Sequence, residues 1–134
     1  MALEFFVLEG RSALVTGGGK GLARMMAQAL AEAEANIAVA SRDEDTCAAA
    51  AKEITETTGR RAIASKLGSW LLPLENEQGS HRNIRGTNQE GRASREDGTD
   101  NDLKGMTVFL GSETSRYVTG QVTPVDGGTT AAYH

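Results

Sequence analysis

The sequence lacks the features of several broad classes of protein. Its single cysteine, Cys47, excludes an intramolecular disulfide and a cysteine-rich zinc site. Acidic residues outnumber basic ones by 18 to 14, and the net charge of −4 offers no basic field for nucleic acid or an anionic membrane surface. No apolar run approaches the ~20 residues of a membrane span. The N-terminal MALEFFVLEG also lacks the basic start and long apolar core of a secretory signal. We therefore expect a soluble, cytoplasmic protein.

The 134 residues correspond to one domain, and their composition changes twice along the chain. Residues 1–65 are rich in alanine and have periodic apolar positions. Residues 66–101 are polar and aperiodic, and they predict a disordered linker because they cannot bury enough apolar surface to offset their ordering entropy. Residues 102–134 predict a helix and a strand that complete the same domain.

Short apolar strands alternate with helices in the first half of the chain. The strands are expected at Ser12–Thr16, Asn36–Ser41 and Arg61–Ser65, and the helices at about 21–33 and 44–58. Asp43 is the expected N-cap of the second helix, and Gly59 is its expected stop. Apolar strands joined by helices predict an α/β fold, in which helices cover both faces of a parallel sheet.

A glycine-rich loop joins the first strand to the first helix. It reads Thr16-Gly17-Gly18-Gly19-Lys20-Gly21-Leu22-Ala23. Glycines allow positive φ and let the backbone approach a ligand, and the helix behind them offers free N–H groups and a positive dipole end to a phosphate. The pattern leaves two interpretations open: a phosphate-binding loop, or a tight turn with no ligand.

Two segments resemble the short-chain dehydrogenase/reductase family. LEGRSALVTGGGKGLARMMAQALAEAEANIAVASR resembles the family's N-terminus, whose motif is Thr-Gly-x-x-x-Gly-x-Gly. Thr16, Gly17 and Gly21 match this motif, and Ala23 replaces its last glycine. DLKGMTVFLGSETSRYVTGQVTPVDGG resembles the family's last helix and last strand. The resemblance implies a partial Rossmann-like sheet and an NAD(P)-dependent oxidoreductase, truncated internally between two retained ends.

The resemblance places a dinucleotide site at the glycine loop and the end of the second strand. The expected cofactor-binding residues are Thr16, Gly17, Gly19, Lys20, Gly21, Leu22, Ser41 and Arg42. A basic residue after the second strand accommodates a 2′-phosphate, so Arg42 with Lys20 favours NADP over NAD. The alternative is a solvated Arg42 that meets no ligand. Binding is expected to be weak or absent, because the elements that hold the nicotinamide half are missing.

The catalytic residues of the family are missing as well. Its proton transfer uses a tyrosine whose pKa is lowered by a lysine four residues further on. Here Gln121 stands four residues after Tyr117, and Tyr133 is the penultimate residue. Lys66-Leu67-Gly68 stands where the family has an aspartate after its third strand. Neither histidine has a neighbour at metal-ligand spacing. We expect no catalytic residue and no metal ligand.

Two functions follow from this pattern. The first is an oxidoreductase by family, which retains dinucleotide-binding elements but is inactive alone. The alternative is a non-catalytic remnant that binds a nucleotide or associates with intact family members. The expected partners are therefore the dinucleotide and either a second copy of the chain or an intact relative.

The family's strand order, 3-2-1-4-5-6-7, predicts an exposed edge in this chain. Without strands four to six, one side of the first strand has no backbone partner. We expect about four strands in the order 3-2-1-7, with Gln121–Val125 beside the first strand. Alternatively, two chains pair through that edge, or the edge covers part of an intact family member. A second local departure is Glu34, which stands where the family has a glycine; a left-handed conformation there would cost roughly 1–2 kcal/mol.

Overall fold

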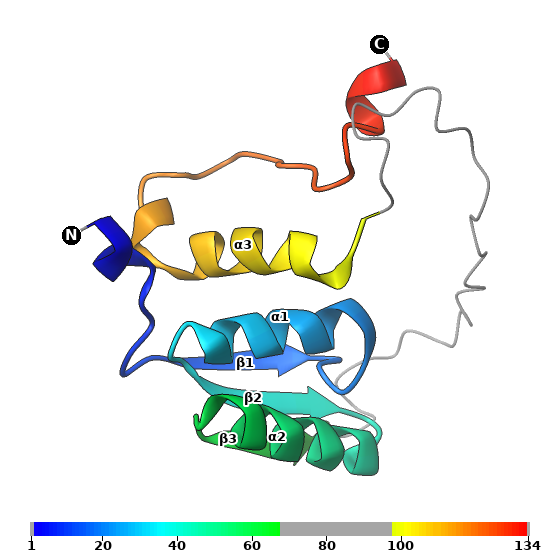
Figure 1. Ribbon diagram of the computed structural model, residues 1–134. Helices are drawn as coiled ribbons and strands as arrows, with labels where there is room; N and C mark the ends of the chain where they lie inside the picture. The colour runs from blue at the N-terminus through cyan, green and yellow to red at the C-terminus, as the bar shows by residue number, and fades with distance from the viewer. Residues whose placement is uncertain (1, 68–97, 134) are drawn as a thin grey trace.

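The computed structural model describes residues 2–67 and 98–133 (Figure 1). Most of the linker expected at residues 66–101 therefore lies outside the described residues. Its first residue, Lys66, belongs to a strand, and its last two, 100 and 101, begin a helix.

Three parallel strands and two helices alternate through the first half, as the sequence predicts. They are β1 (Ser12–Thr16), α1 (Gly21–Glu32), β2 (Asn36–Ser41), α2 (Glu44–Thr58) and β3 (Ala62–Lys66). Among the described residues the sheet has the order β1-β2-β3, with Ala13 opposite Ile37 and Ile37 opposite Ala62. The α/β class is confirmed, and β3 lies one residue later than expected. No helix in the described part of the chain is both long and apolar enough to cross a membrane.

Local residue choices explain where the elements begin and end. The Asp43 carboxylate accepts the backbone N–H of Thr46 at 3.1 Å, which caps α2 as expected. Gly59 ends the same helix with a φ of 72°, in the left-handed region that glycine adopts without strain. Glu34 follows α1 with a φ of 84°, so the expected left-handed position holds a side chain. Its carboxylate forms an ion pair with Arg60.

The hydrophobic core lies between the sheet and helices α1 and α2. Ile37 and Val39 of β2 belong to one buried cluster with Cys47 and Ile54 of α2, and each is at most 2% exposed. Burial of such a branched side chain contributes about 1.5–3 kcal/mol. Helix α1 adds small alanines, which let the helix approach the strands closely. Cys47 is thus a fully buried member of the core.

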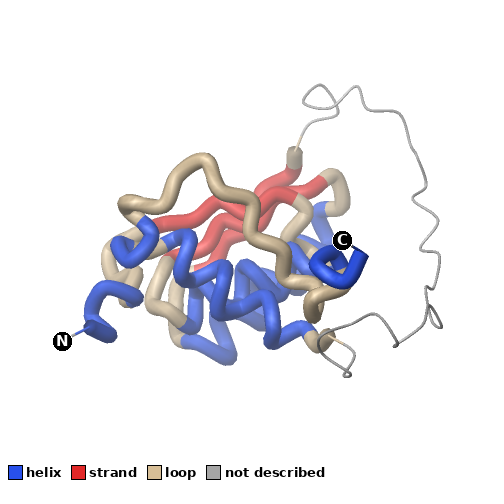
Figure 2. Tube along the Cα trace, turned by 90° about the horizontal axis from the view of Figure 1, so that it is seen from above, coloured by secondary structure: helices blue, strands red, loops and turns tan. Residues whose placement is uncertain are grey.

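Helices cover one face of the sheet rather than the two expected from the sequence (Figure 2). The chain moves in one direction from β1 to β3, and right-handed crossovers then place α1 and α2 on the same side. On the other face Leu14 is 66% exposed and Ile63 is 48% exposed. The apolar strands predicted a sheet buried on both faces, but within the described residues only one face is covered.

The C-terminal helix α3 (Asp100–Gly111) packs beside α1. A Cβ on Gly111 would lie 3.2 Å from Leu30, and Lys104 donates hydrogen bonds to the Glu32 carboxylate at 3.0 and 3.1 Å. A short 3₁₀ helix, η4 (Glu113–Ser115), follows, and Glu113 forms an ion pair with Arg11 just before β1. These contacts fix the position from which the tail departs.

The fourth strand expected at Gln121–Val125 is not present, so the proposed order 3-2-1-7 is wrong for the described residues. The segment is extended, but it pairs with no strand and is exposed throughout. In Figure 1 it runs along α3, on the opposite side of that helix from α1 and β1. The docking of α3 on α1 therefore directs the tail away from the edge that it was expected to cover.

Candidate phosphate-binding site

The carboxyl ends of the three parallel strands meet at one edge of the sheet. Thr16 ends β1, Ser41 ends β2 and Lys66 ends β3. The register confirms their proximity, because Thr16 lies opposite Ala40 and Ser41 lies opposite Lys66. In open α/β sheets, ligands bind outside these carboxyl ends. The glycine loop and the first turns of α1 and α2 all begin here.

The glycine loop uses conformations that other residues avoid. Gly17 has a φ of 69°, and its N–H donates to the carbonyl of Ala40 at 2.7 Å, which holds the loop against β2. Gly21 has a φ of 61° and begins α1. A side chain at either position would be strained, so both matches to the family motif have a conformational reason.

The two middle glycines are needed for close packing. A Cβ on Gly18 would lie 3.0 Å from the backbone oxygen of Val15 and 3.2 Å from Val39. A Cβ on Gly19 would lie 2.8 Å from Cγ2 of Thr46, in the first turn of α2. The loop is thus pressed between the sheet and the start of the second helix. Gly18 was not among the expected site residues, although the loop depends on it.

The cap residue of α1 supplies no side-chain acceptor that would compete with a ligand for the first N–H groups of the helix. Lys20 is the N-cap in an extended conformation, and its side chain makes no capping hydrogen bond. The first turn contains no acidic residue. Its N–H groups and the positive end of the helix dipole therefore remain available to an anion. Leu22 in this turn is 57% exposed, and its contact with a ligand stays a prediction.

Ser41 holds the turn between β2 and α2. Its hydroxyl donates to the carbonyl of Asp43 at 3.0 Å and accepts the Asp43 N–H at 3.2 Å. The Cys47 thiol donates to the Ser41 hydroxyl oxygen at 3.0 Å. Since its hydrogen is engaged within the turn, the Ser41 hydroxyl can offer a ligand no donor without breaking this bond. Its role in cofactor binding stays a prediction.

Charged groups surround the start of α2. Hydrogen bonds from the hydroxyl and N–H of Thr46, assisted by the charge of Lys20, lower the pKa of Asp43 below its ordinary value. Lys66 reaches from β3 to Glu44, with Nζ 3.6 Å from the carboxylate. Arg42 is exposed and makes no ion pair within residues 2–67 and 98–133. Its guanidinium is therefore available to an anion at the carboxyl end of β2.

The structure places all eight expected residues at the carboxyl edge of the sheet. The loop residues Thr16, Gly17, Gly19, Lys20, Gly21 and Leu22 adjoin the turn that carries Ser41 and Arg42. Sequence reasoning omitted Thr46, which both bonds Asp43 and touches the loop. It also treated Lys66 only as a replacement for a family aspartate. Its position at the end of β3, after a short apolar run, was the signal that it shares this edge.

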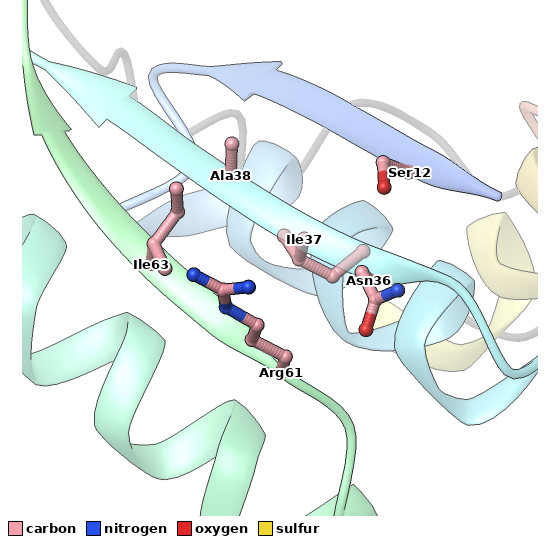
Figure 3. Close-up of a pocket in the computed structure, with 6 residues that line it drawn as sticks. All are labelled: Ser12, Asn36, Ile37, Ala38, Arg61 and Ile63. Carbon is pink, nitrogen blue, oxygen red and sulfur yellow. The ribbon is translucent and has the colours of Figure 1, made fainter. Parts of the chain in front are cut away.

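A shallow depression on the uncovered sheet face lies elsewhere (Figure 3). It is lined by Ser12, Asn36, Ile37, Ala38, Arg61 and Ile63. Ser12 and Asn36 begin their strands, and Arg61 immediately precedes β3, so the depression lies toward the amino ends. It is therefore separate from the glycine loop. In the part of the chain that the structure describes, no group of three His, Cys, Asp or Glu side chains is placed to hold a metal ion.

Two family profiles match successive parts of the sequence. One, described as short chain dehydrogenase, matches residues 11–68. The other, described as enoyl-(acyl carrier protein) reductase, matches residues 72–130. The first includes the glycine loop and all three strands. The second includes α3 and the extended tail.

Curated relatives are similar to the first half of the chain. A rhamnolipid-biosynthesis 3-oxoacyl-[acyl-carrier-protein] reductase from Pseudomonas aeruginosa is 42% identical over 65 residues, which is 48% of this chain and 25% of the relative. A short chain dehydrogenase/reductase, astE, from Aspergillus oryzae is 41% identical over 58 residues, which is 43% of this chain and 22% of the relative. The matched part therefore spans about a quarter of these relatives or less.

One solved structure is similar over nearly the whole chain. It is a candidate short-chain alcohol dehydrogenase from Sinorhizobium meliloti, with a TM-score of 0.76 and 19% sequence identity. The superposition covers 95% of this chain and 99% of that one. At this identity the likeness shows the fold alone, and it agrees with a Rossmann-like arrangement.

Proposed function

Because the chain belongs to the short-chain dehydrogenase/reductase family, we propose that its glycine loop binds the phosphate-bearing adenosine half of NADP(H). The supporting observation is the start of α1, where Lys20 provides no side-chain cap and no acidic residue stands in the first turn. Phosphate is the ligand class that suits free N–H groups at a positive helix end. The glycine loop in front of that helix allows the backbone of the protein to approach it.

The charges at the end of β2 support NADP rather than NAD. Binding of the unphosphorylated ribose favours a carboxylate that accepts its hydroxyls, whereas a 2′-phosphate favours a cation. The Asp43 carboxylate is already bonded to the N–H and hydroxyl of Thr46. Arg42 is exposed on this turn and makes no ion pair with a residue that the structure describes. The site therefore offers a cation, and not an unoccupied carboxylate, to the ribose.

We propose further that the chain does not catalyse hydride transfer by itself. Proton transfer in the family needs a tyrosine with a lysine four residues later, and neither tyrosine of this sequence has one. Tyr117 is 96% exposed in the tail, and Gln121 rather than a lysine stands four residues after it. Loss of the proton-transfer group alone costs about 10²–10⁴ in rate.

Titration of the purified chain with NADPH tests the binding proposal. We expect weak, saturable binding that changes cofactor fluorescence, with no oxidation of NADPH when carbonyl substrates such as a 3-oxoacyl thioester are added. The matched control is Gly17→Asp, which strains the loop and places a negative charge beside the phosphate. Equal binding by this variant, or no binding by the parent chain, would contradict the proposal. Turnover that Gly17→Asp abolishes would show that the chain is an active enzyme.

The uncovered sheet face supports a second function, as a module that associates with an intact family member. Leu14 and Ile63 expose apolar surface there, and the edge of β1 has no partner in the described residues. Mixing the chain with a purified intact reductase distinguishes this function from nucleotide binding. A change in sedimentation that NADPH does not require would support it, and independent sedimentation of the two proteins would exclude it.

A further inference from the structure

The free edge of β1 presents an ordered row of backbone groups. The Arg11 carbonyl accepts the Asn36 N–H at 2.9 Å, and the Gly17 N–H donates to Ala40. In a parallel strand the residues that bond a given neighbour alternate. Odd-numbered residues of β1 therefore face β2, while the N–H and C=O groups of Ser12, Leu14 and Thr16 point away from it. In the described structure these groups have no backbone partner.

Nothing in β1 protects that edge from another strand. Its sequence, SALVT, has no charge and no proline, the devices that usually keep sheet edges from pairing. The flanking Arg11 is engaged with Glu113. Leu14, at the centre of the edge, is 66% exposed on the uncovered face. An added strand would gain hydrogen bonds along the edge and would also cover this side chain.

The tail provides a second set of unpaired backbone groups. Residues 119–125 make no hydrogen bond with any described residue and are exposed throughout. Val122 is 94% exposed. Residues 121–125 belong to no helix or strand, so no element has to unfold before they pair. Within one chain, α3 lies between the tail and the β1 edge (Figure 1). The unpaired backbone groups of the tail therefore do not meet those of β1.

Proline fixes how the tail can pair. Pro124 has no N–H, and in sheets proline occurs where that position faces away from the ladder. If Pro124 faces outward, Val122 does also, because alternate residues share an edge. Gln121, Thr123 and Val125 then direct their backbone groups toward the partner. Three residues of the tail thus face the three outward residues of β1: Ser12, Leu14 and Thr16.

We propose that the β1 edge binds the Gln121–Val125 tail of a second copy of this chain. Each copy carries one edge and one tail, so two reciprocal exchanges close the assembly at a dimer. The tail becomes the new outer strand, and Pro124 then protects it from further pairing. This contact meets the glycine loop only at Thr16, through the backbone at the end of β1.

Two proline variants test the pairing by changing neighbouring positions. Thr123→Pro removes an N–H that faces β1, whereas Val122→Pro removes one that faces away. Neither N–H makes a hydrogen bond with any residue that the structure describes, so both variants should fold equally well. Sedimentation from low micromolar to near-millimolar concentration should show a monomer–dimer equilibrium. Dimerisation should be about tenfold weaker or more in Thr123→Pro, because both interfaces lose a backbone bond, and little changed in Val122→Pro.

Hydrogen exchange identifies the strand that receives the tail. Amides of Ser12, Leu14 and Thr16 should exchange rapidly in dilute protein and slowly where the dimer forms. Amides of Ala13 and Val15, which face β2, should be protected at both concentrations. The proposal is overturned if the chain remains monomeric throughout, if the two proline variants dimerise equally, or if the even-numbered amides are slow in the dilute monomer.

Discussion

Gly19 lies directly against Thr46, so close that a Cβ at Gly19 would stand 2.8 Å from the Thr46 methyl group. The same threonine donates its N–H and hydroxyl to Asp43, the cap of α2. A single side chain therefore connects the glycine loop to the start of α2, just after the turn that contains Arg42. This contact fixes the position of the glycine loop relative to the turn between β2 and α2.

Gly19→Ala should displace the loop and weaken NADPH binding. Thr46 is β-branched and hydrogen-bonded, so it cannot move aside without losing its bonds to Asp43. We expect a loss of about 1–3 kcal/mol of stability, typical of overpacking, together with weaker binding. Thr46→Ser removes the clashing methyl group and keeps the hydroxyl. The double variant should regain stability in urea unfolding and affinity in titration; additive losses would show that the contact does not position the loop.

Alanine should have opposite effects at two other glycines. A Cβ on Gly18 would press on the Val15 backbone, and we expect Gly18→Ala to destabilise the chain by about 1–3 kcal/mol. A Cβ on Gly105, within α3, would meet open space. Gly105→Ala should stabilise the chain by about 1 kcal/mol through helix propensity. Urea unfolding measures both, and a shift in the same direction for the two variants would be inconsistent with this packing of the loop.

Glu34→Gly should stabilise the protein despite the loss of an ion pair. The φ of 84° strains any residue with a Cβ by roughly 1–2 kcal/mol, and glycine relieves that strain. The partly exposed pair with Arg60 contributes about 0–1 kcal/mol, and glycine adds entropy to the unfolded chain, so the net gain should be small, up to about 1 kcal/mol. Glu34→Gln is the control, because it removes the charge and keeps the strain. If both variants lower the melting temperature equally, the strain is not significant.

Asp43 should make stability depend on pH in the acid range. Its pKa is lowered in the folded chain, chiefly by the Thr46 hydroxyl. The stabilisation is therefore present above the unfolded aspartate pKa of about 3.9 and is lost as the pH falls through the lower folded value. Asp43→Asn should be less stable than the parent at neutral pH, and the difference should shrink on acidification. A difference that stays constant down to strongly acid pH would argue against this charge effect.

Much of the first half could be predicted from its sequence. The bounds of β1, β2 and α2 follow from short apolar runs and from Asp43 and Gly59, whose capping roles depend on neighbours in the chain. The left-handed Glu34 was expected because a family glycine occupies its place. These features are local, so the sequence around each position contains their cause.

Features set by tertiary packing were missed or wrong. Gln121–Val125 has the composition of a strand, but the docking of α3 on α1 determines where that segment runs. The sheet has apolar strands, yet the direction of its crossovers leaves one face uncovered. Gly18 and Thr46 belong to the candidate site through contacts between separate elements. No spacing within the sequence distinguishes these contacts from ordinary loop and helix positions.

Competition between NADPH and NADH for the purified chain tests most directly whether this fold selects the phosphorylated nucleotide. Arg42 is the free cation expected to meet the 2′-phosphate. The parent chain should bind NADPH more tightly than NADH, and 2′,5′-ADP should compete about as well as NADPH because the nicotinamide half gains little. Arg42→Asp should abolish or reverse the NADPH preference while leaving the fold, followed by circular dichroism, unchanged. An unaltered ratio of the two affinities in Arg42→Asp would contradict the proposed site.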